Sequence, residues 1–157
     1  MSNRLSAALY KSDDSHNMLV FSYADLDLMY SPGFPLADLR PLRETIWDAQ
    51  WLARIGNWVS TWERELKEQD DTSGIVVAAL ANDIITAEEL ERAEISVAEL
   101  RDRIHDHGLE ETFLRDWEQH YTELRANPPP TKVLELDGYI EGLATVLQYH
   151  LASRGYK

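Results

Sequence analysis

The stretch from Trp47 to Glu65 carries the polar side chains that are best placed to form a binding or catalytic site. Read as a helix, it places Asn57, Thr61 and Glu65 at i, i+4 and i+8, about 6 Å apart on one slowly drifting face. Their amide, hydroxyl and carboxylate oxygens suit a hard cation such as Mg²⁺, which can keep further positions open for phosphate oxygens. Arg64, beside Glu65, could meet such a phosphate. The three side chains Asn57, Thr61 and Glu65 are called the triad below.

The triad belongs to a longer polar strip made of Arg43, Gln50, Arg54, Asn57, Thr61 and Glu65. Polar strips on long helices commonly face water, which is the simpler interpretation. However, Gly56 in mid-helix costs about 1 kcal/mol relative to Ala, and Asn and Thr each cost a few tenths. A solvated face would more naturally carry Glu, Lys and Gln, so both interpretations stay open on the residues alone.

This stretch resembles the second metal-binding motif of class I terpene synthases: Asn or Asp, then Asp, two residues, Ser or Thr, three residues, and Glu. The triad matches the three ligand positions, and Arg64 matches the basic residue that often precedes the Glu. Trp58 stands where the motif has an Asp that is not one of the ligands. The resemblance implies that Asn57, Thr61 and Glu65 hold Mg²⁺ and that Arg64 binds a diphosphate.

Composition limits the alternatives. The 157 residues fit a single domain with a substantial core, at 44% hydrophobic and 27% charged residues, and the lack of cysteine excludes disulfides and thiolate metal sites. A net charge of −13 argues against binding nucleic acid through the general surface, although a metal ion can create a local phosphate site. The first residues contain no long apolar run, so we expect neither a secretory signal nor a membrane span, and a cytoplasmic protein.

Apolar residues recur mainly with helical periodicity, which predicts a single all-α domain over residues 1–157. The expected helices cover 1–12, Asn17–Tyr30, a long segment from near Asp38 to near Glu68, Ile75–Ala81, Glu110–Ala126 and Thr131–Ser153. Capping boxes at Thr86 with Glu89 and at Ser96 with Glu99 predict two more helix starts, the second helix ending near Gly108. SPGFP at 31–35 and NPPP at 127–130 interrupt the helices.

This order resembles the C-terminal half of a class I terpene synthase, so the resemblance implies a helical half-barrel. In that family the last helix leads to an Arg–Tyr pair, and here Arg154 and Tyr156 occupy the place with Gly155 inserted between them. The family also senses the diphosphate with a basic residue on an earlier helix, for which Arg4 and Lys11 are the candidates. Arg64, Arg154, Tyr156 and Lys11 are therefore the expected diphosphate-binding residues.

The family's other metal site, an Asp-rich motif far upstream of the triad, has no clear counterpart, and a full synthase domain is about twice as long. The nearest match is Asp13-Asp14-Ser15-His16-Asn17, which fits either a helix cap or a metal site. We therefore expect a complementary N-terminal half or a homo-oligomer to complete the protein, because half of a helical barrel would expose apolar faces.

Two other clusters have both a structural and a functional interpretation. Trp47, Trp51, Trp58 and Trp62 crowd one side of the long helix, where they could pack against other helices or line a pocket that stabilises carbocations. Trp58 is the best pocket candidate because it is nearest the triad. His105, Asp106 and His107 have the letters of a metal site, but residues two apart on a helix point in very different directions.

The activity that the resemblance implies is Mg²⁺-dependent ionisation of a prenyl diphosphate followed by cyclisation, the work of a carbon–oxygen lyase acting on phosphates. Metal and guanidinium groups would stabilise the charge on the leaving diphosphate. The alternative is a non-catalytic helical interaction module that keeps the fold. The missing Asp-rich half favours the module for the isolated chain, whereas the triad with Arg64 and the terminal Arg–Tyr pair favours the enzyme.

Overall fold

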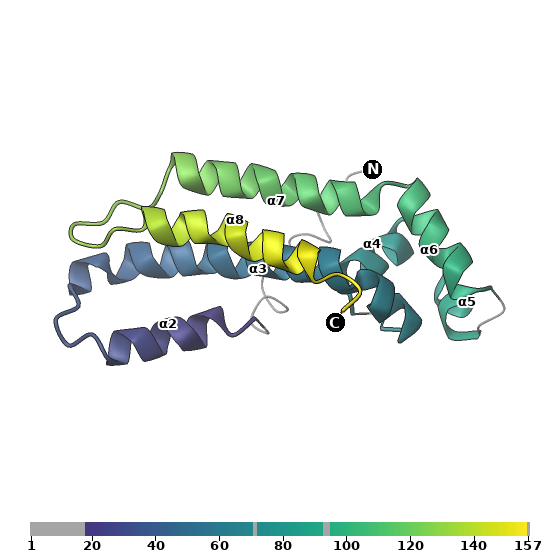
Figure 1. The fold of residues 1–157 in the computed structure, drawn as a ribbon, viewed down its shortest axis with the longest axis horizontal. Helices are drawn as coiled ribbons and strands as arrows, with labels where there is room; N and C mark the ends of the chain where they lie inside the picture. Colours follow the sequence, from purple (N-terminus) through teal and green to yellow (C-terminus); the bar gives the residue numbers. More distant parts are fainter. Residues whose placement is uncertain (1–17, 71, 93–94, 157) are drawn as a thin grey trace.

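A computed structural model describes residues 18–70, 72–92 and 95–156 of the chain. Every regular element in these ranges is a helix, which confirms the all-α class for this part of the protein (Figure 1). The helices are α2 (Val20–Met29), the 3₁₀ helix η2 (Leu36–Asp38), α3 (Leu39–Lys67), α4 (Gly74–Ala81), α5 (Ala87–Arg92), α6 (Val97–Asp106), α7 (Leu109–Ala126) and α8 (Asp137–Ala152). The expected helix over 1–12, Arg4, Lys11 and the Asp13–Asn17 segment lie outside the described residues.

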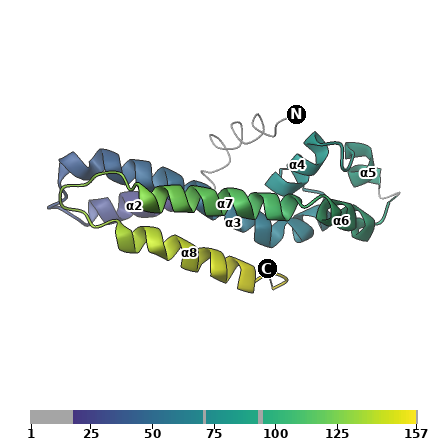
Figure 2. The same ribbon diagram turned by 90° about the horizontal axis from the view of Figure 1, so that it is seen from above.

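The 29-residue helix α3 is the axis of the fold. It contacts α2, α4, α6, α7 and α8, and these helices surround it along its length. Figures 1 and 2 show α8 running alongside α3 in the same direction, with α2 and α7 running the opposite way. The short helices α4, α5 and α6 gather around the C-terminal end of α3. Residues of the triad thus lie on the one helix that most of the others contact.

Local sequence explains where α3 begins and ends. Pro41 stands in its first turn, where a missing N–H costs no intrahelical hydrogen bond. Arg64 and Lys67 stand in its last turn, where positive charge offsets the negative end of the helix dipole. The predicted span, from near Asp38 to near Glu68, is therefore confirmed.

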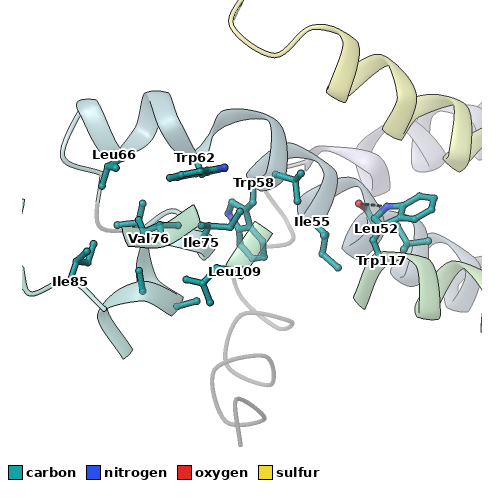
Figure 3. Close-up of a cluster of buried hydrophobic side chains, with 14 of the residues drawn as sticks. Leu52, Ile55, Trp58, Trp62, Leu66, Ile75, Val76, Ile85, Leu109 and Trp117 are labelled. Carbon is teal, nitrogen blue, oxygen red and sulfur yellow. Dashed lines mark hydrogen bonds between the residues drawn. The ribbon is translucent and has the colours of Figure 1, made fainter. Parts of the chain in front are cut away.

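The core of the protein forms along one side of α3 (Figure 3). Trp58 and Trp62 are each about 1% exposed and pack with residues of α4, α6 and α7. Toward the middle of α3, the indole Nε1 of Trp117 donates a 3.0 Å hydrogen bond to the backbone oxygen of Leu52, so that the buried polar atom is satisfied. This bond ties α7 to α3 across the core.

The two predicted capping boxes differ in the structure. At the start of α5, Thr86 N donates to Glu89 Oε2 at 2.8 Å and Glu89 N donates to Thr86 Oγ1 at 3.2 Å, which is the complete reciprocal box. At the start of α6, Ser96 Oγ accepts from Glu99 N, but the Glu99 carboxylate accepts from Arg103 instead. Both helices begin where the sequence predicted.

The last helix begins later than predicted, at Asp137 rather than near Thr131. The cause is the buried carboxylate of Asp38, which accepts hydrogen bonds from the backbone N–H groups of Lys132 at 2.8 Å, Val133 at 2.8 Å and Leu134 at 3.1 Å. Because the N–H groups of these three residues turn toward Asp38, this segment is held outside the helix. The contact joins segments 94 to 96 residues apart, so local patterning could not predict it.

Replacing Asp38 with Asn should destabilise the fold, because an amide would turn a donor toward backbone N–H groups. Burial alone would raise the pKa of Asp38, but the three backbone hydrogen bonds outweigh it and lower that pKa below its ordinary value. A lowered folded-state pKa contributes stability above about pH 4 that is lost as pH falls through the folded-state value. In thermal unfolding, Asp38→Asn should melt several degrees lower than the parent at pH 7, and the gap should narrow below about pH 4. Exposed Asp116→Asn is the control, and equal melting of the two variants would contradict the prediction.

Gly74 and Gly142 should respond in opposite directions to substitution by Ala. A Cβ at Gly74 would lie 2.5 to 2.7 Å from three atoms of the buried Trp58 indole, so Gly74→Ala should cost about 1–3 kcal/mol by overpacking. A Cβ at Gly142 would meet nothing within 4 Å, and Ala should stabilise the helix interior by about 0.5–1 kcal/mol. Urea unfolding of both variants measures this, and a fully stable Gly74→Ala would mean that Trp58 is not held against α4.

Candidate functional site

Two of the three triad side chains meet in the structure. Thr61 and Glu65 are 4% and 8% exposed, and Thr61 Oγ1 lies 2.7 Å from Glu65 Oε1. The same hydroxyl lies 2.7 Å from the backbone oxygen of Asn57. A hydroxyl has one proton, so it donates to only one of these two acceptors at a time. The side chain of Asn57 is half-buried one turn earlier on the same face.

Glu65 has an oxygen that the described residues leave without a partner. Its Oε2 is buried and accepts no hydrogen bond, while Oε1 faces Thr61 and lies 3.7 Å from Nη2 of Arg64. A buried carboxylate oxygen without a donor or cation is costly, and native structures rarely leave one in that state. The triad offers oxygen atoms of the type that hard cations prefer, and Glu65 carries the only formal negative charge among the three.

Part of the polar strip outside the triad is also buried, although Arg43 at its start is exposed. Gln50 is 0% exposed, and neither its Oε1 nor its Nε2 makes a hydrogen bond with the described residues. Arg54 has a buried Nε in the same condition, and its guanidinium carbon lies 4.9 Å from the centre of the Trp58 ring. A solvated helix face would not bury these atoms, so the water-facing interpretation does not hold for Gln50, Thr61 and Glu65.

A pocket of about 220 Å³ opens beside the triad, near the C-terminal end of α3. It brings together Arg64 and Arg154, two residues predicted to bind diphosphate, with Thr61. The sequence did not single out Lys67, a third cation in the lining, although Arg64 and Lys67 are i and i+3 on one helix. The full lining, called the basic pocket below, is Val59, Ser60, Thr61, Trp62, Glu63, Arg64, Lys67, Arg154 and Gly155.

Arg154 holds the C-terminal end of α8 against two other helices. Its Nη2 donates to the backbone oxygen of Val59 at 2.8 Å and to Glu110 Oε1 at 2.7 Å. The other oxygen of Glu110 accepts from Trp62 Nε1 at 3.0 Å. Arg154 therefore has a structural role in addition to any role toward an anion, and its buried Nε makes no hydrogen bond with the described residues.

Tyr156 is not brought to the triad or to the basic pocket. Its side chain is 92% exposed, two residues beyond Arg154. Gly155 between them has a φ of +83°, a left-handed conformation that glycine adopts readily, and it turns the chain. The inserted glycine thus separates the directions of the two side chains.

The four tryptophans of α3 divide between core and surface. Trp58 meets Trp51 and Phe113 edge-on, with ring centres 5.8 and 5.9 Å apart, whereas Trp47 is 40% exposed. Packing between helices, the structural alternative, is therefore what the fold shows for Trp58 and Trp62. Trp58 turns its ring into the core and does not line the basic pocket, so it is not the pocket residue that its place beside the triad suggested.

The two histidines of α6 have separate partners, as their spacing predicted. His105 Nε2 lies 3.5 Å from Glu63 Oε1 and its ring packs against Trp62, whereas His107 Nδ1 lies 2.8 Å from the backbone oxygen of Arg103. Within the described ranges, no group of three or more His, Cys, Asp or Glu side chains is arranged to hold a metal ion. A cation at the triad would thus use mixed oxygen ligands with a single carboxylate.

Comparisons of the chain with protein-family models, with curated proteins and with solved structures each find no match. None of the helices in the described ranges is both long and apolar enough to cross a bilayer. The evidence on function is therefore the geometry of the polar strip and the basic pocket.

Arg154→Ala should lower stability as well as any anion affinity. It removes two hydrogen bonds and leaves the largely buried Glu110 carboxylate with Trp62 alone, so a loss of about 1–3 kcal/mol is expected in urea unfolding. Arg125→Ala is the matched control, because the Arg125–Glu141 pair is more than half exposed and such pairs contribute about 0–1 kcal/mol. Equal losses in both variants would show that Arg154 does not hold the C-terminus in place.

Proposed function

We propose that this chain is a terpene synthase-like protein that binds Mg²⁺ and a prenyl diphosphate along α3. The observation that carries the proposal is Glu65 Oε2, a buried carboxylate oxygen without a partner among the described residues. Thr61 lies against the same carboxylate and Asn57 precedes it on the same face. The class I resemblance of this stretch supports the same assignment of Asn57, Thr61 and Glu65 as the ligands.

Each residue has a separate task in this proposal. Glu65 supplies the negative charge that draws the cation, and Thr61 and Asn57 supply neutral oxygens. Bound there, Mg²⁺ supplies positive charge that favours departure of a diphosphate when its carbon–oxygen bond breaks. Arg64 lines the basic pocket and also lies against Glu65, so it could contact a diphosphate bound in the pocket or at the triad.

The charges of the basic pocket support an anionic ligand. The C-terminal end of a helix carries partial negative charge, so an anion beside the last turn of α3 must be held by nearby cations. Arg64 and Lys67 project from that turn, and Arg154 reaches the pocket from the end of α8, so three cations outnumber Glu63, the one acidic residue of the lining. Their positive charges contrast with a chain whose net charge is −13.

The prenyl chain would need a wall that the described residues do not supply beside the triad. The basic pocket has a volume of about 220 Å³ and a mixed polar and apolar lining that includes three cationic side chains, which suits a diphosphate better than a hydrocarbon chain. In this proposal a second chain covers the strip, completes an apolar cavity and supplies the Asp-rich metal site. A complementary N-terminal half could supply both, whereas another copy of this chain could supply only the wall of the cavity.

A non-catalytic interaction module is the second candidate. It is favoured by the apolar residues that α2 and α8 leave exposed, with Tyr23 and Met29 on α2 and Val146 and Tyr149 on α8 as examples. Exposed apolar surface of this kind is typical of docking faces. In this alternative, the triad would bind no metal and the chain would act only through its partner.

Titration with Mg²⁺ distinguishes the two candidates. The protein should bind Mg²⁺ weakly alone and several-fold more tightly with inorganic diphosphate present, because the metal keeps open positions for phosphate oxygens. Glu65→Gln should lose most of this gain, Thr61→Ala should lose less, and Thr61→Ser should keep nearly all of it because the hydroxyl remains. Isothermal titration calorimetry on the parent and the three variants measures these differences.

Glu68→Gln is the matched control, because Glu68 is an exposed carboxylate on the same helix, 3.6 Å from Arg64. If Glu68→Gln lost as much of the diphosphate-dependent gain in Mg²⁺ affinity as Glu65→Gln, the gain would reflect the overall negative charge of the protein and not a specific site. The titration should be repeated with a complementary N-terminal half, together with an assay for turnover of farnesyl or geranylgeranyl diphosphate. If diphosphate does not improve Mg²⁺ binding in that mixture and no turnover is seen, the interaction module is the remaining candidate.

A further inference from the structure

A second pocket lies at the opposite end of α3, between α2, the first turns of α3 and the start of α8. Its volume is about 410 Å³, which is within the range of small-molecule sites. Most of the lining is apolar, with side chains that include Val20, Leu28, Phe34, Leu42, Ile46 and Leu134. This lining is called the apolar pocket below.

The apolar pocket is separate from the proposed metal site. Ile46 and Glu65 are nineteen residues apart on α3, which places them about 28 Å apart along the axis at ~1.5 Å per residue. One small ligand could not contact the triad and fill the apolar pocket. Any ligand of the apolar pocket would therefore be distinct from the ligand of the triad.

Few polar side chains belong to the lining: Tyr23, Asp27, Ser31 and Tyr139. Asp27 is the only charged residue in the lining, and no ion pair joins it to another described residue. Burial, and then the nearby Asp27 carboxylate, raise the pKa of the Tyr139 phenol, so this hydroxyl stays protonated and near a negative charge. Ser31 Oγ is already engaged, donating 2.8 Å to the backbone oxygen of Asp27.

We propose that the apolar pocket binds a small lipophilic ammonium compound, with its hydrocarbon part over Leu42 and Ile46 and its positive charge beside Asp27. An apolar body matches the lining, and a cation matches its only charge. Tyr139 adds a hydroxyl that can hydrogen-bond to a polar group next to the ammonium. A carboxylate of the same size would meet repulsion from Asp27, and a neutral alcohol would lose the ionic attraction.

Three probes with one hydrocarbon body and different head groups test the proposal: 4-phenylbutylammonium, 4-phenylbutanol and 4-phenylbutanoate. Titration of the full-length protein followed by NMR should rank the ammonium first, the alcohol second and the carboxylate last. Because Asp27 is solvent-exposed, its contribution is modest, and we expect about a threefold advantage of the ammonium over the alcohol. Asp27→Asn should remove that advantage and leave the affinity for the alcohol unchanged.

Asp25→Asn is the matched control for the acidic surface as a whole. Asp25 is also exposed on α2, but it lines a different depression, beside Phe21 and Trp47. Asp25→Asn makes the net charge less negative by one, as Asp27→Asn does, but it leaves the pocket unchanged, so the ammonium should keep its advantage. Ala24→Leu, which adds bulk at the pocket wall, should weaken all three probes, with circular dichroism as the check on folding.

Several outcomes would overturn the proposal. Equal affinity for the three probes, or no binding, would show that Asp27 selects nothing. Equal effects of Asp25→Asn and Asp27→Asn would assign the preference to the overall charge of the protein. Binding of a second copy of the chain at this face, seen as self-association in sedimentation that the ammonium does not disturb, would assign the pocket to a protein interface. Glu65→Gln should not alter the probe affinities, so this test is independent of the proposed metal site.

Discussion

The packing of Trp58 and Trp62 fixes how α3 is rotated about its own axis. Trp58 and Trp62 must both point into the space between α4, α6 and α7, and the tight fit of Gly74 against the Trp58 indole leaves little freedom. Side chains on a helix advance by about 100° per residue, so burying these two indoles also sets the direction of Thr61 and Glu65. Core packing thus sets the direction of the oxygen atoms of the candidate site.

Two polar contacts position α8 on this axis, one at each end. Asp38 binds the backbone of the segment before α8, and Arg154 joins the segment after it to Val59 and Glu110. Both contacts satisfy buried or half-buried groups that would be costly alone. Apolar packing between helices permits sliding, whereas hydrogen bonds at both ends specify one register. The hydrogen bonds that fix the C-terminal end of α8 also hold the Arg154 side chain in the lining of the basic pocket.

Much of the fold could be predicted from periodicity and caps, because α3 and the starts of α5 and α6 depend on residues close in sequence. The start of α8 could not, since Asp38 competes for backbone groups almost a hundred residues away. The same difference applies to the site. The spacing of Thr61 and Glu65 predicted that they meet, while the pairing of Arg154 with Glu110 and the meeting of His120 Nε2 with Asp48 at 2.9 Å depend on how α7 and α8 pack.

The two ends of α3 differ in the charged side chains that line their pockets. In a chain of net charge −13, three cations converge at the C-terminal end of α3, where the helix dipole is itself negative. An anion there is favoured only by contacts within a few ångströms, because the more distant surface repels it and salt screens that repulsion. At the other end of α3, the negative charge of Asp27 and the negative net charge of the protein both attract cations. A phosphate site on this protein therefore requires close, specific ligands, which is the arrangement that a carboxylate-bound metal with Arg64 and Lys67 would provide.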